Sequence, residues 1–390
     1  MAANLSSLAA DPGFRRAPFL LFCGAFLALN VLVAKWQSAL ERSRRANLLV
    51  PEEQVKQYKN ARYDRSVGQY LGAYLKVVPD ATQQPLVILA GMSQMYVIND
   101  QPGGGETISE HLDDYYRQQG IRVFGLAAPN MDNEEAMLEL LAAVSSPRTK
   151  PTVFIYGVCF DKFRNIGVRP DLQSFMKDNP AVQRFWTDAT EIARSRYPAA
   201  AAMMSESSPT QAAAAAPVAD ASFESRLRTD AGVAIPIVKS RSDLNAYVQD
   251  RLYTFRNFVL GISNTTKRPI IKSRYDVNRE FLGLLADVAE AHGVRLVMYN
   301  IPLNPQAETP YVPEQYEEFK QWLTKFAYDR RIPFANLENS VPIEQWGLRN
   351  GSPDFKHFNE AGHKTTAAAI RQEFDSVIRS QREIATTDIH

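Results

Sequence analysis

The sequence predicts an α/β fold in which a parallel sheet carries helices on both faces, preceded by a single N-terminal transmembrane helix. Three observations predict it. Short apolar runs of strand length alternate with amphipathic helical segments. Several of these runs end at Gly or Asn, where the chain turns. One uncharged apolar stretch near the N-terminus is nearly long enough to span a bilayer.

The overall composition excludes several classes of protein. The chain has 390 residues, 45% of them apolar, with 44 Lys or Arg against 43 Asp or Glu and a net charge of +1. It is too apolar and too evenly charged to be wholly disordered, and it lacks the basic excess of a nucleic-acid binder. Two cysteines give no disulfide framework. A mean hydropathy of -0.28 excludes a protein with many membrane spans.

Residues 17–34 form the apolar stretch, which holds no charge and one amide, Asn30. At about 1.5 Å per residue it approaches the roughly 30 Å of a hydrocarbon core. Leu32 stands where a signal peptidase prefers a small residue, so we expect an uncleaved anchor over residues 17–36 behind a cytoplasmic tail, residues 1–16. A buried core helix is the alternative. Basic residues flank both ends, and their count alone would place the C-terminal domain in the cytoplasm.

Residues 37–83 are polar with helical spacing and predict a stalk or helical connector. The α/β domain follows over residues 84–380, where apolar runs predict buried parallel strands and amphipathic segments predict helices. The predicted strands are residues 86–90, 121–124, 152–156, 294–299 and 332–337. The predicted helices are residues 108–119, 133–144, 277–292, 313–330 and 360–380. Residues 381–390 predict a disordered tail.

An insertion over about residues 160–276 interrupts the alternation. Residues 198–221 hold 11 alanines and three prolines, which favours a flexible loop, with an Ala-rich helix as the alternative. Residues 226–275 hold ten Lys or Arg against three Asp or Glu, a local net charge of +7. This basic stretch contains a helical pattern that could meet an anionic polymer or lipid headgroups, or simply be a solvated helix face.

In parallel α/β sheets, ligands bind beyond the carboxyl ends of the strands. Ser93 directly follows the first apolar run of the domain, in the sequence Gly91-Met92-Ser93-Gln94. A serine at such a turn projects its hydroxyl over the sheet edge, where N–H groups of the next element can stabilise an oxyanion. By itself the common tripeptide Gly-x-Ser more often marks a turn serine that caps a helix.

A second candidate lies ahead of the last predicted helix. Asp354 precedes His357 by three residues, on a predicted loop entering that helix. An Asp at this spacing can orient the imidazole while the other ring nitrogen acts as a general base. Of five histidines, His357 alone has an acidic residue so placed, and His363 inside the helix is expected to be structural.

Ser93 after the first strand and Asp354-x-x-His357-x-Asn359-x-x-Gly362-His363 before the last helix resemble the SGNH/GDSL hydrolase superfamily. The resemblance covers roughly residues 84–380 and implies a flavodoxin-like three-layer fold. It implies that Ser93 is the nucleophile, His357 the base and Asp354 its orienting partner. With the anchor and the large insertion, the chain resembles more narrowly the DltD-like proteins and the SGNH proteins that work with membrane-bound O-acyltransferases.

The chain departs from the family at the blocks that supply oxyanion donors. Met92 replaces the Asp of Gly-Asp-Ser, no glycine after residues 121–124 is in register, and Cys159 stands where the third block has Asn. The backbone N–H of Ser93 is then the firmest donor. The remaining candidates for oxyanion or substrate binding are Gly91, Asn130, Gly157 and Asn165.

The resemblance implies a serine esterase or O-acyltransferase that acts on an acylated cell-surface polysaccharide or polymer. It also implies a single-pass inner-membrane protein with an extracytoplasmic, periplasmic domain, against the weak charge count, and a membrane-bound O-acyltransferase as a partner. The alternative is a non-catalytic module that binds an anionic glycan or such a partner; an unrelated α/β fold is a third reading.

No cofactor and no metal are expected. The sequence holds no Cys/His spacing typical of zinc, no Walker motif and no strand-linked Gly-x-Gly-x-x-Gly. Cys159 follows a predicted strand at the active edge of the sheet and could be nucleophilic with a lowered pKa, but a buried structural role is the commoner outcome for cysteine.

Overall fold

The computed structural model describes residues 35, 61–62, 71–72, 75–76, 78–96, 98, 105–128, 130–207, 266–349 and 352–387. The chain divides into two compact units. The first, Met1–Val55 with Ala216–Ser263, contains one described residue, Lys35. The second, Lys56–Ala215 with Asn264–His390, contains all the others.

A six-stranded parallel sheet forms the centre of the second unit, in the order β1-β3-β2-β4-β5-β6. All five predicted strands are present with shifted ends, so the prediction of a parallel α/β sheet is confirmed. Counted among themselves they follow the flavodoxin-like order 2-1-3-4-5. The strands are β1 (Ala61–Arg62), β2 (Leu86–Gly91), β3 (Arg122–Ala127), β4 (Val153–Val158), β5 (Arg295–Asn300) and β6 (Phe334–Asn336).

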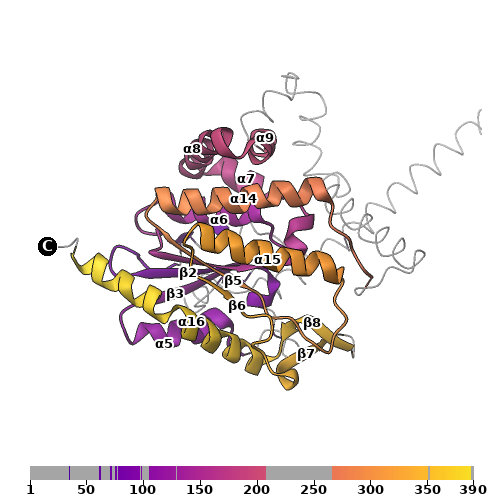
Figure 1. The fold of residues 1–390 in the computed structure, drawn as a ribbon. Coiled ribbons are helices and arrows are strands. Elements are labelled where there is room, and N and C mark those ends of the chain that lie inside the picture. Colours follow the sequence, from indigo (N-terminus) through magenta and orange to yellow (C-terminus); the bar gives the residue numbers. More distant parts are fainter. Residues whose placement is uncertain are drawn as a thin grey trace, which may run out of the picture. The chain divides into compact units, whose positions relative to one another are not determined.

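Helices cover both faces of this sheet, which gives three layers (Figure 1). On one face lie α5 (Ile108–Arg117) and α16 (Glu360–Thr387). On the other lie α6 (Asn133–Val144), α14 (Lys272–Ala291) and α15 (Pro313–Asp329). Because both faces are covered, the central strands can be apolar along their whole length, and every residue of β2 and of β4 is buried.

The strand register brings the carboxyl ends of the strands to one edge. Gly91 at the end of β2 pairs with Ala127 at the end of β3, and Val158 at the end of β4 pairs with Asn300 of β5. The strand order reverses at β2, which lies between β3 and β4. Such a switch point is where open α/β sheets bind their ligands, and Ser93 directly follows it.

The described part of the insertion between β4 and β5 is mostly helical. It comprises η2 (Phe160–Arg164), α7 (Pro170–Asp178), α8 (Pro180–Arg196) and α9 (Pro198–Ser207), before the chain reaches α14. The prediction of a flexible loop over residues 198–221 is therefore wrong for residues 198–207, and residues 208–221 lie outside the described part. Pro198 is tolerated as the first helical residue, which needs no N–H. The next two N–H groups, of Ala199 and Ala200, donate to Glu280 Oε2 on α14 at 2.8 and 2.9 Å.

Two other predicted boundaries are corrected. Within the predicted helical connector, residues 61–62 instead form β1, which extends the sheet beside β3 because that edge has unpaired backbone groups. Within the predicted disordered tail, α16 continues to Thr387, since no Gly or Pro stops it.

Two predictions fall on the rest of the chain. The predicted anchor, residues 17–36, lies outside the described residues apart from Lys35, as does the basic stretch up to residue 265. Among the residues that are described, no helix is both long and apolar enough to cross a bilayer.

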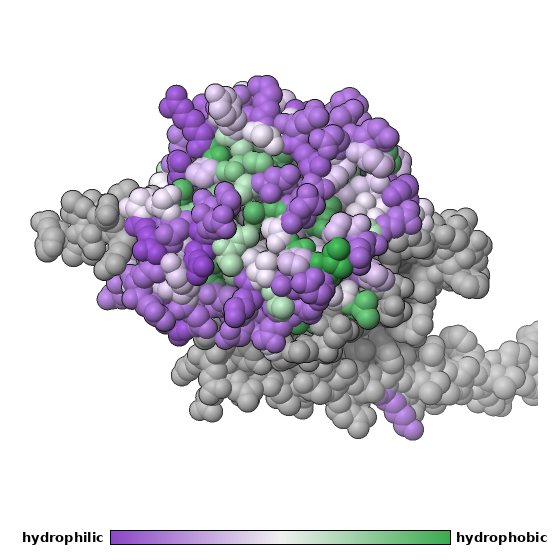
Figure 2. All heavy atoms as spheres, turned by 60° about the horizontal axis from the view of Figure 1, so that its bottom comes forward, coloured by the Kyte–Doolittle hydropathy of each residue, from purple (hydrophilic) through white to green (hydrophobic). Residues whose placement is uncertain are grey.

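Hydrophilic residues cover most of the described surface in Figure 2, and apolar ones gather in a central band on that face. The large apolar side chains that stand exposed are few among the described residues and belong to different elements: Ile271, Tyr328, Ile343 and Leu348. Scattered single exposures of this kind are ordinary and do not by themselves mark an interface.

Helix α6 is buried on every side, because α14 and α8 both pack on it above the sheet. Its polar face is therefore covered, and neither carboxylate oxygen of Glu139 has a hydrogen-bond partner among the described residues. Burial, with a smaller effect of the Glu135 carboxylate, raises the pKa of Glu139 well above its ordinary value, while Arg169 lowers it by less. Burial likewise raises the pKa of Glu134 to about 7.

We expect Glu139→Gln to increase the free energy of unfolding at pH 8 by about 1–3 kcal/mol, because the amide cannot ionise, whereas the buried carboxylate carries the larger cost of an unpaired charge. Because the pKa of Glu139 is raised in the folded state, the stability of the wild-type protein is fully present below the unfolded pKa of about 4.3. It is lost progressively as the pH rises toward the folded pKa of this carboxyl. Urea unfolding from pH 5 to pH 8 should thus show a growing advantage of the variant over wild type. Glu191→Gln, at an exposed site on α8, is the control. A constant difference across this range would contradict the account.

Candidate active site

The turn after β2 places Ser93 at the carboxyl edge of the sheet. The strand ends at Gly91, Met92 is extended, and Ser93 begins the short 3-10 helix η1 (Ser93–Met95). Met92, Gln94 and Met95 are buried, whereas Ser93 is half-buried. The buried residues on both sides of Ser93 therefore hold its backbone in place, while the Ser93 side chain stays partly exposed to solvent.

The antiparallel hairpin of β7 (Trp346–Arg349) and β8 (Ser352–Phe358) carries Asp354 and His357. The prediction that they lie on a loop is wrong, because both residues lie within strand β8, which pairs with β7 and directly precedes α16. Ser93 Oγ lies 3.0 Å from His357 Nε2, and His357 Nδ1 lies 2.8 Å from Asp354 Oδ2. The three side chains singled out in the sequence, 264 residues apart at the extremes, thus form one continuous relay.

Further hydrogen bonds fix the Asp354 carboxylate. Its Oδ1 accepts from the backbone N–H groups of Lys356 at 3.0 Å and His357 at 3.3 Å. Asn304 Nδ2 donates to the carbonyl oxygen of Asp354 at 3.0 Å. Asp354 is 4% exposed and His357 7% exposed, so water competes little for the ion pair that a protonated imidazole would form.

The rest of the C-terminal motif has structural roles. Asn359 Oδ1 accepts from the Gly362 N–H at the start of α16, and its Nδ2 donates to the carbonyl oxygen of Glu344. A Cβ on Gly362 would lie 2.6 Å from the Gln345 carbonyl oxygen, so only glycine allows this close approach. His363 is fully buried, and its ring meets the Phe358 ring edge-on at 5.4 Å. These contacts hold the helix against the hairpin that carries His357.

Sequence reasoning missed Gln94, which joins the two halves of the site. Its side-chain Nε2 donates to the carbonyl oxygens of Pro302 at 2.8 Å and Lys356 at 2.7 Å, and the residue is fully buried. Gln94 thereby ties the residue after Ser93 to the residue before His357. Asn304 was also missed as a residue of the site. Asn304 lies in the Pro-containing segment of residues 300–305, but nothing local in the sequence shows that its side chain contacts Asp354.

We expect Gln94→Leu to leave two buried carbonyl oxygens unsatisfied, at about 1–3 kcal/mol each, and to let the hairpin move relative to Ser93. Ester turnover should fall about tenfold or more in kcat with a smaller change in KM, since misplacement affects the reacting groups more than binding. Thermal unfolding and steady-state kinetics measure both effects. Gln173→Leu, at an exposed position on α7, is the control. Unchanged kcat in folded Gln94→Leu protein would rule out this positioning role.

The structure does not bring all the predicted oxyanion residues to Ser93. Gly157 lies within β4, where a Cβ would fall 2.3 Å from Met95 Cε and 2.9 Å from Tyr299 Oη. A Cβ on Gly91 would lie 2.5 Å from Met95 Cε. Both glycines therefore make room for the Met95 side chain. Asn165 is exposed, and its carbonyl oxygen accepts from Asn278 of α14 at 2.6 Å, so its described contact is with that helix.

Asn130 is different, because it has a φ of 53° in the loop after β3. This left-handed conformation favours glycine, and Asn is one of the few other residues that tolerate it. Since β3 pairs with β2, the loop lies at the same sheet edge as Ser93. Asn130 therefore lies at the same sheet edge as Ser93, in a conformation that glycine would adopt.

Cys159 is fully buried at the end of β4, and its Sγ lies 3.6 Å from the Tyr311 hydroxyl. Burial, followed by the charge of Asp161, raises the pKa of this thiol. A protonated, inaccessible thiol is a poor nucleophile, which favours the structural interpretation. Over the part of the chain that the structure describes, no cluster of His, Cys, Asp or Glu could hold a metal ion.

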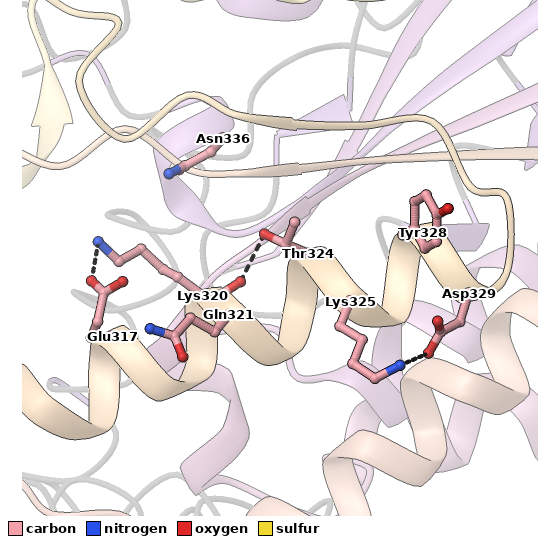
Figure 3. A pocket seen from close by; sticks show the side chains of 8 residues that line it. All are labelled: Glu317, Lys320, Gln321, Thr324, Lys325, Tyr328, Asp329 and Asn336. Carbon is pink, nitrogen blue, oxygen red and sulfur yellow. Dashed lines mark hydrogen bonds and ion pairs between the residues drawn. The ribbon is translucent and has the colours of Figure 1, made fainter.

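A surface groove of about 610 Å³ runs along α15 and contains none of the triad residues. Figure 3 shows that its charged side chains pair with one another, Lys320 with Glu317 and Lys325 with Asp329. Because these charges are neutralised within the helix, the groove presents no reactive group.

Comparison with known proteins gives the following. No family model matches the sequence, and no curated protein matches it. A Bacteroides fragilis protein assigned as an acylhydrolase superposes on 81% of this chain and 100% of its own, with 9% identity and a TM-score of 0.38. A GDSL-like lipase from Bacteroides thetaiotaomicron superposes on 80% of this chain and 98% of its own, with 10% identity and a TM-score of 0.38. Because these sequence identities and TM-scores are so low, the function of the site has to be inferred from the contacts of its own residues.

Proposed function

We propose that this protein is an SGNH-type serine esterase or O-acyltransferase that forms an acyl-enzyme on Ser93. The observation that carries the proposal is the relay from Ser93 Oγ to His357 Nε2 and from His357 Nδ1 to Asp354 Oδ2, at 3.0 and 2.8 Å. A serine hydroxyl is a weak nucleophile unless a base within hydrogen-bond reach removes its proton, and a third group must orient that base.

The first half of the reaction follows from this geometry. Ser93 Oγ attacks the ester carbonyl carbon as its proton passes to His357 Nε2, and the Asp354 carboxylate stabilises the imidazolium. The tetrahedral intermediate collapses, the acyl group stays on Ser93, and the departing alcohol takes the proton from His357. In the second half, water or a sugar hydroxyl attacks the acyl-enzyme with the same base, which gives hydrolysis or transfer.

Two groups are proposed to stabilise the oxyanion. The N–H of Ser93 lies in the first turn of η1, where a helical N–H has no partner within its own helix. Asn130 is the second proposed group, because its left-handed φ gives the loop after β3 the backbone conformation that a glycine would give. Each such donor is worth about 10²–10³ in rate. Gly157 is not proposed, since it lies beneath Met95.

The substrate and the location of the protein remain part of the proposal. The apolar stretch at residues 17–34 supports a single-pass anchor in the inner membrane, and the resemblance to DltD-like proteins favours an extracytoplasmic domain. Such a protein would act on an acylated cell-surface polysaccharide, beside a membrane-bound O-acyltransferase. The relay itself favours catalysis over the non-catalytic module, which has no use for an aligned serine, histidine and aspartate.

The experiment that tests the proposal separates hydrolysis from transfer. Purified protein is mixed with p-nitrophenyl acetate, with and without an oligosaccharide acceptor, and p-nitrophenol, acetate and acetylated sugar are measured. We expect p-nitrophenol release that depends on Ser93, and, for a transferase, acetylated sugar formed in place of acetate. No ester turnover above that of the Ser93→Ala protein would contradict both forms of the proposal.

A further inference from the structure

Lys356 on β8 takes part in the candidate active site with both of its backbone groups. Its N–H donates to Asp354 Oδ1 at 3.0 Å, and its carbonyl oxygen accepts from Gln94 Nε2 at 2.7 Å. The next residue is His357, whose Nε2 lies 3.0 Å from Ser93 Oγ. Because a rigid peptide unit joins the two residues, a shift of Lys356 also shifts the catalytic base.

The side chain of Lys356 is held separately, by an ion pair with Asp161. Lys356 Nζ lies 3.6 Å from Asp161 Oδ2, and the two side chains are only 10% and 17% exposed. Water therefore screens this pair far less than it screens an exposed one. Asp161 lies in η2, which follows β4, and β4 is the neighbour of β2 in the sheet. The ion pair thus ties the strand that carries His357 to the main sheet.

Contacts of this kind fix the hairpin, because β7 and β8 form a two-stranded sheet of their own. Gln94, in the turn after β2, donates to the Lys356 carbonyl oxygen. Asn304, in the segment after β5, donates from Nδ2 to the Asp354 carbonyl oxygen at 3.0 Å. Asp161 supplies the corresponding contact from the segment after β4. Three neighbouring strands of the sheet are thus each followed by a side chain that contacts β8.

A second ammonium group, that of Lys162, is close enough to interact with the same ion pair. Lys162 is buried, and its Nζ has no hydrogen-bond partner among the described residues. Burial, followed by the charge of Lys356, lowers the pKa of Lys162 to about 8. Cys159, Asp161 and Asp132 act in the opposite direction. The ammonium groups of Lys356 and Lys162 therefore repel each other, and the Asp161 carboxylate offsets both charges.

We infer that Asp161 is a positioning residue, which holds the base His357 in register with the serine by pairing with Lys356. This inference rests on the proposed function and adds a residue that acts through Lys356, not on the reacting atoms. The two partners of the pair should not be equivalent. Without Asp161, two poorly solvated ammonium groups repel each other, whereas without Lys356 the carboxylate still interacts with Lys162.

The test is a double-mutant cycle on the full-length protein with p-nitrophenyl acetate as the substrate. We expect Asp161→Asn to lower kcat at least about tenfold and to change KM less than about threefold, because misplacement affects the reacting groups more than binding. Lys356→Met should lower kcat only about fivefold. The double variant lacks the repulsion, so its kcat should match that of Lys356→Met and exceed that of Asp161→Asn. Independent sites do not show such a recovery.

Conservative variants keep the test decisive if Asp161→Asn does not fold. Lys356→Arg keeps the charge and should retain kcat within about twofold, unlike Lys356→Met, and Asp161→Glu should do the same. The exposed pair of Lys325 and Asp329 on α15 supplies the matched control. Lys325→Met and Asp329→Asn, singly and together, should leave kcat unchanged.

Three results would overturn the positioning role. They are an unchanged kcat in folded Asp161→Asn protein, a double variant whose loss is the product of the two single losses, and a Lys356→Arg protein as slow as Lys356→Met. Failure of the proposed function is a different result, namely wild-type ester turnover no higher than that of the Ser93→Ala protein.

Discussion

Ser93→Ala is expected to lower kcat/KM for a simple ester by about 10⁴–10⁶-fold, the range found when a catalytic serine is removed from a triad. The reason is that Cys159, the other candidate nucleophile weighed among the described residues at this edge, is fully buried, and burial raises the pKa of its thiol. The remaining rate would come from binding and oxyanion donors alone. Initial rates of p-nitrophenyl acetate hydrolysis measure the loss.

The matched control for this substitution is Ser195→Ala, an exposed serine on α8 whose hydroxyl bonds to its own helix. It should retain full activity. A Ser93→Ala protein that is folded and keeps more than about one tenth of the wild-type activity would exclude Ser93 as the nucleophile.

Asp354→Asn is expected to lower kcat by about 10⁴-fold while the protein stays folded. The amide oxygen can still accept from the N–H groups of Lys356 and His357, as Oδ1 does now. The amide nitrogen, however, would face His357 Nδ1, where an acceptor stands in the native protein at 2.8 Å. The imidazole would then take the tautomer that carries its proton on Nε2, and it could not accept the proton of Ser93.

Kinetics and thermal unfolding distinguish this effect from a loss of structure. Asp329→Asn, at an exposed site on α15, is the control and should be neutral. An Asp354→Asn protein with an unchanged melting temperature and nearly full kcat would show that Asp354 does not orient the base.

The strands could be predicted because short, continuous apolar runs are typical of strands in a sheet whose two faces are both covered by helices. The triad was predictable because Ser93 and Asp354-x-x-His357 each occupy a characteristic position relative to an element, and the parallel topology brings these positions to one edge. Gln94 and Asn304 could not be predicted, since their contacts join segments more than 200 and about 50 residues apart.

Other predictions were wrong because they depended on which residues pack against the segment in the folded protein. The Ala-rich residues 198–207 resemble a linker in composition, but Glu280 of α14 supplies the missing acceptor for their first turn. Gly91 and Gly157 resemble oxyanion residues by position, yet their missing side chains make room for Met95. The role of a glycine in a strand depends on what packs against it, which a single sequence does not contain.

Labelling with a fluorophosphonate probe, followed by peptide mass spectrometry, tests the central claim most directly, because the probe reacts with a serine only when a base activates it. The account predicts that Ser93 is the labelled residue, that His357→Ala abolishes its labelling, and that His292→Ala does not. No label on Ser93 in folded protein, or equal labelling of Ser93 in the His357→Ala variant, would contradict it.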